Sequence, residues 1–292
     1  MDSLQLSTFI IIAETGSFSA AAERLHLTQP AVSKRMALLE EQLGTRLFDR
    51  LGKHISLSQA GRVLLPRARA IVQAIGEAER AIGDLSGTVS GRLSIATSHH
   101  IGLHRLPPVL GQFSRAHPEV SLDLHFLDSE KALEAVERGD FDLGVITLPD
   151  ERPKALQALP IWRDELCFVA APSHPLAGSA KSLKDLTTFQ AILPDAGTYT
   201  TRLIQQLFEA ERLPLTINMV TNHLDTIKMM VSVGLGWGVL PEPMVDDSLT
   251  RLDLEIDTLE RSLGAVYHRG RSQSNASKMF LHTLTQSSLA GR

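Results

Sequence analysis

Two short helical segments joined by a three-residue turn, near the start of the chain, constrain the fold most strongly. In residues 17–25, the small side chains of Ala20 to Ala22 would let another helix approach closely. After the turn at residues 26–28, Thr28 is suited to cap a helix and Pro30 to its first turn, where no backbone N–H is needed. One face of this second helix is apolar and must be buried; it comprises Val32, Met36, Leu39 and Leu43.

The opposite face of this second helix is small, polar and basic. It presents Pro30, Ser33, Lys34 and Ala37, with Gln29 exposed at the start of the helix. Such a helix fits the DNA major groove, which is about 12 Å wide. There Gln pairs with adenine, Ser meets either kind of base, and Lys reaches guanine or phosphate. The spacing suits a helical bundle with an ordinary solvated face as well, so it leaves both structures open.

A hairpin is expected next. Residues 47–57 have strand-like ends around Gly52 and Lys53. A basic hairpin beside a recognition helix is a wing, with Lys53 at its tip and Arg50 below, where they would contact phosphate or enter the minor groove. Taken singly, each basic residue is also compatible with a solvated surface charge.

A long helix follows the hairpin. Its apolar residues recur at spacings of three and four; they are Leu64, Ala68, Ile71, Ile75, Ala78, Ile82 and Leu85. Such a heptad seam needs a partner helix, so we expect residues 58–86 to pair with a second copy of the chain. Pro66 is expected to kink the helix. Gly83, Gly87 and Gly91 mark a hinge into the next domain.

Charge divides the chain into a basic front and an acidic remainder. Residues 24–69 contain nine Lys or Arg and three acidic residues, whereas residues 91–292 contain 19 basic and 24 acidic residues. A polyanionic partner is therefore expected at one end only. Apolar runs such as 9–13 and 166–172 fall far short of the roughly 18 residues that a membrane-spanning helix needs. With no secretory signal pattern at the N-terminus, we expect a cytoplasmic protein that makes no membrane contact.

From residue 92 onward, short apolar runs alternate with helical ones, which predicts parallel α/β packing. The first set of strands is expected within 93–97, 120–126 and 142–147, with helices at 106–116 and 130–138. The second set is expected within 166–172, 191–194, 216–220 and 237–241, with helices at 200–210 and 223–233. Two similar lobes of this kind predict a cleft between them.

Polar side chains follow several of these strands. In such sheets, ligands bind beyond the carboxyl ends of the strands, where helix N-termini present free N–H groups. The candidate effector-binding residues are Thr97, Ser98, His99, His100, Thr147, Thr198, Thr200, Thr201, Arg202, Asn222 and His223. Their hydroxyl, imidazole, amide and guanidinium groups would suit a small anionic or polar metabolite, especially a carboxylate. Each of them taken singly is also explained as a helix cap.

No residue pattern calls for catalysis, a metal or a cofactor. The chain lacks the G-x-S-x-G, P-loop and H-E-x-x-H motifs, and the glycines at 234–238 follow a helix and precede a strand, the reverse of a dinucleotide loop. His99, His100 and His104 have no carboxylate at matching spacing, so no metal site is expected. The single Cys167 lies in an apolar run, which indicates a buried inert thiol. We expect no enzyme, no metal and no cofactor.

The turn, the second helix and the wing together carry a resemblance. Residues 17–50 read SFSAAAERLHLTQPAVSKRMALLEEQLGTRLFDR, and LSQAG follows at 57–61. At nearly every informative position this resembles the DNA-binding signature of LysR-type transcriptional regulators. The departures are slight: Lys53 stands where arginine is frequent and Ser58 where threonine is more usual. The resemblance implies groove-facing positions for Gln29, Pro30, Ser33 and Lys34, and the wing tip for Lys53.

The same resemblance implies a fold. The expected class is α+β and multidomain, with a winged helix-turn-helix at 1–58, a coiled-coil dimerisation linker helix and hinge at 59–90, and an effector-binding domain at 91–292. That last domain would be a two-lobed α/β domain similar to type 2 periplasmic binding proteins. Its first lobe would hold about 91–163 and 269–292, and its second lobe about 164–268.

The expected function is sequence-specific DNA binding that regulates transcription and is modulated by a small, anionic metabolite in the cleft. Expected partners are double-stranded promoter DNA, the effector, a second copy of the chain in a dimer or tetramer, and RNA polymerase. A solute-binding protein of the transport type is an alternative that leaves the basic front and the seam unexplained. An α/β enzyme using the same cleft is another. A peroxide sensor that depends on two cysteines is disfavoured by the lone Cys167.

Overall fold

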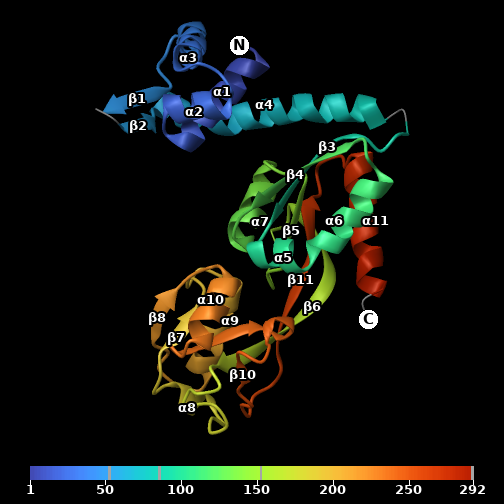
Figure 1. Ribbon diagram of the computed structural model, residues 1–292. Coiled ribbons are helices and arrows are strands. Elements are labelled where there is room, and N and C mark those ends of the chain that lie inside the picture. The colour runs from blue at the N-terminus through green and yellow to red at the C-terminus, as the bar shows by residue number, and fades with distance from the viewer. Residues whose placement is uncertain (52–53, 85–86, 152, 291–292) are drawn as a thin grey trace. The chain divides into compact units, whose positions relative to one another are not determined.

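The computed structural model describes residues 1–51, 54–84, 87–151 and 153–290 (Figure 1). The chain divides into two compact units, Met1–Ser86 and Gly87–Arg292. The elements of the first unit are α1 (Ser3–Thr15), α2 (Phe18–Arg24), α3 (Gln29–Leu43), β1 (Phe48–Leu51), β2 (His54–Leu57) and α4 (Gln59–Asp84). β1 and β2 pair antiparallel, so the predicted hairpin is confirmed, although residues 52–53 at its tip lie outside the described ranges.

Local capping chemistry sets the ends of the helices in the first unit. Gly16 ends α1 in the left-handed conformation, at φ 62°, and the Ser17 hydroxyl then accepts the backbone N–H of Ala20 to start α2. Thr28 caps α3 by accepting the N–H of Ala31, as the sequence predicts. The tight spacing of two helices around residues 25–28 is therefore fixed by side chains that the sequence shows directly.

The core of the first unit contains three of the four residues expected on the apolar face of α3. Val32, Met36 and Leu39 are buried beside Phe9 of α1. Leu43 differs from the prediction, because it lies in the last turn of the helix, at the edge of the unit, and is partly exposed. Burial of this face leaves the opposite face of α3 to solvent.

The predicted seam of α4 divides into two parts. Ala68 is fully buried and Leu64 is half-buried in the unit's own core, so these two residues pack within the unit and not against a partner helix. Ile71, Ile75 and Ile82 are exposed, with Ile82 at 72%. Ala78 is exposed too, while Leu85 lies outside the described ranges, and the helix runs through Pro66.

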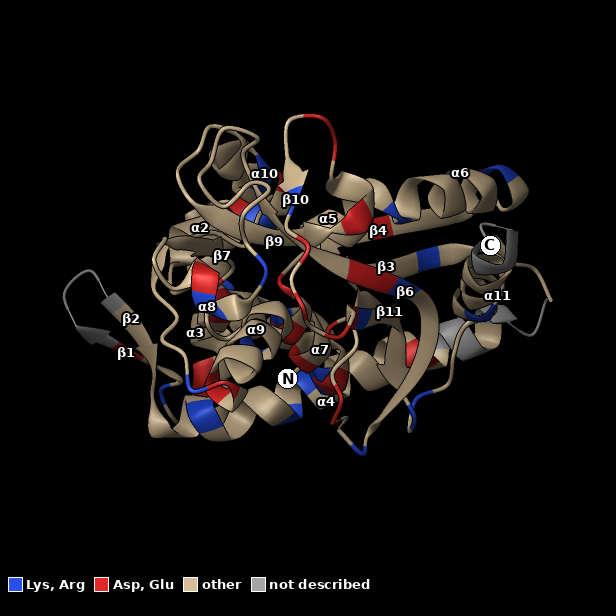
Figure 2. Ribbon diagram, turned by 90° about the horizontal axis from the view of Figure 1, so that it is seen from below, with Lys and Arg blue, Asp and Glu red and all other residues tan. Residues whose placement is uncertain are grey.

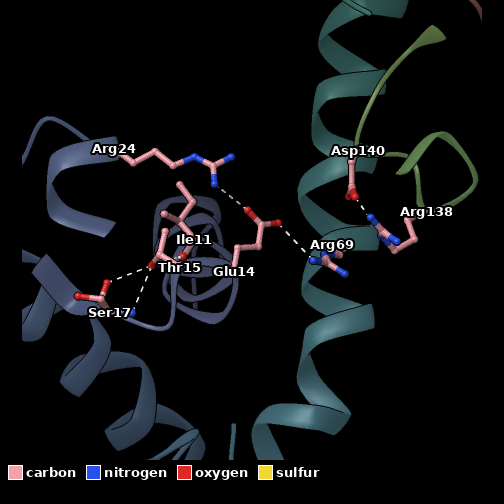
Figure 3. Close-up of polar contacts among 8 residues, drawn as sticks. All are labelled: Ile11, Glu14, Thr15, Ser17, Arg24, Arg69, Arg138 and Asp140. Atoms are coloured by element: carbon pink, nitrogen blue, oxygen red, sulfur yellow. Dashed lines mark hydrogen bonds and ion pairs between the residues drawn. The ribbon is translucent and has the colours of Figure 1, made fainter. Parts of the chain in front are cut away.

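Glu14 ties three helices of the first unit together (Figure 3). Its carboxylate lies 3.1 Å from Arg24 Nη1 of α2 and 3.2 Å from Arg69 Nη2 of α4. Exposed ion pairs contribute little individually, about 0–1 kcal/mol. The pairing therefore fixes the direction of the side chains more than it stabilises the unit.

The second unit consists of two α/β lobes. The first lobe holds β3 (Gly91–Thr97), α5 (His99–His104), α6 (Leu106–Ala116), β4 (Val120–Phe126), α7 (Ser129–Arg138), β5 (Leu143–Thr147) and α11 (Asn275–Ala290). The second holds α8 (Leu183–Leu186), β7 (Ala191–Leu193), α9 (Tyr199–Ala210), β8 (Ile217–Val220), α10 (Leu224–Ser232), β9 (Trp237–Pro241), the short 3₁₀ helix Glu242–Met244 and β10 (Thr250–Arg251). Each lobe contains parallel strand pairs, as expected: β3 pairs with β4 and β5 in the first lobe, and β7 pairs with β8 and β9 in the second.

Two long strands join the lobes, and the sequence analysis did not predict them as such. They are β6 (Leu156–Ala170), of which only the end was expected as a strand, and β11 (Leu259–His268). They pair antiparallel with each other, so the strand order β4-β3-β5-β11-β6-β9-β7-β8 is continuous from lobe to lobe (Figure 1). Parallel pairing is therefore confined to β3, β4 and β5 in the first lobe and to β7, β8 and β9 in the second, whereas β6, β10 and β11 pair antiparallel with their neighbours.

The hydrophobic cores place the lobe boundary. Leu263 and Ala265 of β11 are fully buried in the first lobe's core with Leu93 of β3, whereas Leu259 packs in the second lobe. β11 thus changes lobe near residue 262, earlier than the boundary near 268 that the sequence suggested. Among the helices in the described ranges, none combines the length and apolar character that crossing a bilayer requires.

The crossing of the two strands should tolerate no added side chain. At Gly264 a Cβ would collide with the carbonyl oxygen of Leu159. We predict that Gly264→Ala lowers the free energy of unfolding by about 1–3 kcal/mol, because overpacking forces the backbone to shift. Gly111→Ala in α6 is the control: its Cβ would meet only the Arg115 guanidinium, at 3.4 Å, and should stabilise by about 0.5–1 kcal/mol. Equal urea midpoints for Gly264→Ala and the wild type would contradict this packing.

Candidate functional site

The first unit offers a polar helix face as a nucleic-acid interface. Gln29, Pro30 and Lys34 of α3 are exposed, and Ser33 is half-buried. The Gln29 amide donates to the Ser33 hydroxyl at 2.9 Å, which aligns the two side chains along the helix. Lys53 and the side chain of Arg50 lie outside what the structure describes, so the wing contacts stay a prediction.

Two adjoining hollows lie between the lobes of the second unit, at the carboxyl ends of the strands. The smaller, of about 60 Å³, is lined by Ser98, His99, His100, Asp128, Ser129, Glu130, Thr147, Pro194, Thr198, Tyr199, Thr200, Asn222, Leu224 and Arg261. The larger, of about 290 Å³, is lined by Thr147, Leu148, Pro149, Asp150, Tyr199, Thr200, Arg202, Leu203, Gln206, Glu260, Arg261 and Ser262. The larger hollow alone approaches the size of ligand pockets, which begin near roughly 300 Å³, and the two together reach it.

A buried carboxylate organises the wall of these hollows. Asp164 of β6 is 0% exposed, and its two oxygens lie 3.0 Å from Arg105 Nη2 and 2.8 Å from Arg261 Nη2. The remaining terminal nitrogen of Arg261, Nη1, donates to the Thr200 hydroxyl at 2.8 Å. Two guanidinium groups against one carboxylate give this cluster a net positive charge. Both signs of charge occur along the elements of the second unit (Figure 2), so this excess is local.

His100 faces the same hollow as a neutral ring. Burial, and to a smaller extent the nearby Arg261, lower its pKa to about 4. Neither ring nitrogen has a hydrogen-bond partner among the described residues, since Asp164 lies 3.8 Å from Nε2. A neutral imidazole offers one donor and one acceptor, which a ligand carrying both kinds of group would satisfy.

The N-terminus of α9 supplies the opposite wall, from the second lobe. Thr198 caps this helix by accepting the N–H of Thr201 at 3.3 Å. Tyr199, the first residue of the helix, donates its backbone N–H to the carboxylate of Glu130 of the first lobe at 2.6 Å. Free N–H groups and the helix dipole make this end of α9 favourable for an anion.

The structure places the predicted effector residues unequally. Eight of the predicted residues line a hollow: Arg202 lines the larger one, and the others line the smaller one, namely Ser98, His99, His100, Thr147, Thr198, Thr200 and Asn222. Thr97 lines neither, because it is buried and its hydroxyl donates to the Val145 carbonyl. His223 lines neither, but packs edge-on against His99. Thr201 is buried and donates to the Pro194 carbonyl, so it acts within the second lobe.

Sequence reasoning included Arg202 but missed the other charged members of the site, among them Asp164, Arg261 and Glu130. Asp164 and Arg261 lie on β6 and β11, where the alternation of apolar residues is too irregular to predict a strand. Glu130 was included only in an expected helix, and nothing in the sequence pairs it with Tyr199, which is 69 residues away. Only the crossing of β6 and β11 brings these groups to one place.

Comparison with known proteins covers both units. Residues 4–62 match the model of the bacterial regulatory helix-turn-helix protein, lysR family, and residues 86–288 match the LysR substrate binding domain. A probable RuBisCO transcriptional regulator of Synechocystis sp. is 32% identical over 288 residues, covering 95% of this chain and 84% of that protein.

Two solved structures have similar folds. Full-length CbnR in complex with its target DNA is 21% identical, with a TM-score of 0.67, covering 98% of this chain and all of CbnR. The effector-binding domain of QuiR in complex with shikimate is 19% identical, with a TM-score of 0.62, covering 69% of this chain and 98% of that domain.

The low pKa of His100 has a consequence for stability. In the unfolded chain this pKa returns to about 6.5, so below that pH the unfolded state binds more protons than the folded state. The contribution of neutral His100 is fully present above pH 6.5 and is lost as the pH falls toward 4, by up to about 3 kcal/mol.

We therefore predict that His100→Gln flattens the fall in unfolding free energy between pH 6.5 and 4.5, measured by urea titration. His282→Gln, which changes an exposed histidine of α11, should keep the wild-type profile. An unchanged slope in His100→Gln would mean that another group causes the loss.

Proposed function

This chain belongs to the LysR family of transcriptional regulators, and we propose that a small anionic metabolite held between the lobes of its second unit controls its action on promoter DNA. We infer that the effector is an anion from the position of Arg261. Its side chain is 10% exposed and lines both hollows, and its guanidinium is held by buried Asp164. A preorganised guanidinium of this kind is suited to bind a carboxylate.

The hydroxyl groups around Arg261 refine this proposal. Ser98, Ser129, Thr198 and Thr200 line the smaller hollow, and His100 adds a ring whose two nitrogens have no hydrogen-bond partner among the residues that the structure describes. A carboxylate that also carries hydroxyl or amino groups would satisfy both the cation and these neutral groups. The likeness to the QuiR domain, which is described with shikimate, supports the inclusion of hydroxylated acids among the ligands to test.

The proposed mechanism is a change of lobe angle. The effector would bind side chains of both lobes, so it would favour the arrangement in which the lobes close on it. The exposed part of the α4 seam, Ile71, Ile75 and Ile82, would pair two chains and join two DNA-reading heads. An effector changes DNA binding only if the two lobe arrangements differ in DNA affinity.

Further partners and the location follow from this role. We propose a dimer through α4, with a tetramer as a larger form, and RNA polymerase as a partner at the promoter. The proposed location is the cytoplasm, where the DNA is. We propose no enzymatic role, since the argument for the cleft is one of recognition and the full-length relative cited above carries the name of a regulator.

A thermal-shift screen of the full chain tests the effector class. Central carboxylates, amino acids, aromatic acids and shikimate should include a ligand that stabilises the chain by roughly 2.7 kcal/mol at a hundredfold excess over its dissociation constant. We predict that Arg261→Gln weakens that ligand roughly 10- to 100-fold, as expected for a lost charge-assisted hydrogen bond. Arg163→Gln, an 84%-exposed arginine of β6, is the matched control and should bind as the wild type does. Equal loss in both variants would remove Arg261 from the proposal.

The DNA-reading head has its own test. We predict that Ser33→Ala lowers discrimination among DNA sites by on the order of 1 kcal/mol, because Ser33 belongs to the face of α3 that we propose enters the major groove. Lys53→Ala should weaken binding to all sites evenly, as a phosphate contact would. A competition binding assay distinguishes the two effects. The reverse pattern would show that the two residues exchange roles.

A further inference from the structure

We propose that Glu130 is an internal competitor of the effector: its carboxylate occupies the end of α9 that an anionic ligand needs, and the ligand must displace it. This inference rests on the proposed function, because it concerns the same cleft. It adds a residue that determines which anions bind and with what affinity. The juxtaposition that carries it is Glu130 of the first lobe against Tyr199 of the second.

The contact has the geometry of an anion bound to a helix N-terminus. Glu130 Oε1 accepts the backbone N–H of Tyr199 at 2.6 Å, a short distance typical of charge-assisted hydrogen bonds. Tyr199 is the first residue of α9, a helix of 12 residues whose cap, Thr198, uses its hydroxyl on the N–H of Thr201. The Tyr199 N–H is thus one of the groups that a bound carboxylate would otherwise take.

The same place is built to receive a ligand. Glu130, Tyr199, Thr200 and Arg261 all line the smaller hollow, and Arg261 donates to the hydroxyl of Thr200, the residue next to Tyr199. His100 lines it too, with 8% exposure and with both ring nitrogens unpartnered among the described residues. A ligand carboxylate that reaches Arg261 would therefore lie close to the carboxylate of Glu130.

Two carboxylates in this space repel each other. Like charges about 4 Å apart in a partly buried site repel each other strongly, and the arrival of the ligand brings no additional cation to offset this repulsion. The ligand and Glu130 therefore compete for the Tyr199 N–H and for the positive field of Arg261. The competition lowers the affinity for every monoanion and favours ligands that satisfy His100 and the hydroxyl groups as well.

Displacing Glu130 does not free the lobes from each other. On the α5–α10 side, His104 Nε2 lies 3.4 Å from Asp225 Oδ1, and the His99 and His223 rings pack with centroids 4.4 Å apart. These contacts also join the two lobes, and β6 and β11 connect them covalently. Variants at Glu130 should therefore fold, and the lobes should stay close enough to bind a ligand from both sides.

The test compares the full-length wild type with Glu130→Gln, Glu130→Ala and a control, Glu137→Gln, which changes an exposed acid of the same helix. Hydrogen exchange of the Tyr199 amide is measured first, without added ligand. It should be faster in Glu130→Ala than in the wild type and unchanged in Glu137→Gln. Unchanged exchange in Glu130→Ala would overturn the contact on which the proposal stands.

Affinity for three probes, sulfate, succinate and shikimate, is then measured by calorimetry. Tighter binding of at least one probe, by about fivefold or more in Glu130→Gln and Glu130→Ala but not in Glu137→Gln, is expected. Equal or weaker binding in both Glu130 variants overturns the competition, and if Arg261→Gln still loses binding, the proposed function stands without it. Failure of all three probes to bind Glu130→Ala overturns the competition too, while the wider ligand screen continues to test the proposed function separately.

Discussion

The ion pairing of the buried Asp164 carboxylate is the interaction on which the rest of the second unit depends. It sits on β6, is closed to solvent, and is matched by guanidinium groups from α5's C-terminal end and from β11, at Arg105 and Arg261. A buried charge left without partners destabilises a fold strongly, so the three groups must stay together. That requirement fixes Arg261 in the wall of the cleft and leaves the cluster with excess positive charge. Burial lowers the pKa of His100 most, and Arg261 adds to this effect, so the ring is neutral.

The two crossing strands give this cluster its place. β6 and β11 run antiparallel and belong to both lobes, so any change in the angle between the lobes acts on them directly. Asp164 and Arg261 of the charged cluster lie on these strands, while the polar groups that face them come from α5 and α7 on one side and from α9 on the other. A ligand that binds this cluster is thereby in contact with both lobes, which is the physical basis for coupling binding to lobe angle.

In the first unit, the apolar residues of the single helix α4 differ in their surroundings along its length. The start of α4 packs on the head through Ala68, and its later turns expose Ile71, Ile75 and Ile82. One continuous apolar stripe is thus divided into a buried and an exposed part, because the rest of the first unit covers only its beginning. The sequence could not show this division, since the spacing of the stripe is the same along its length.

The sequence by itself determined the local structure: the Thr28 cap, the buried face of α3, the hairpin, and the parallel α/β pattern of each lobe. These follow from side-chain periodicity and from capping and turn chemistry, which act over a few residues. Only the tertiary structure decided which groups meet in the cleft. Asp164 lies 97 residues from Arg261, and Glu130 lies 69 residues from Tyr199. Contacts at that separation depend on strand order and lobe packing, which no local pattern encodes.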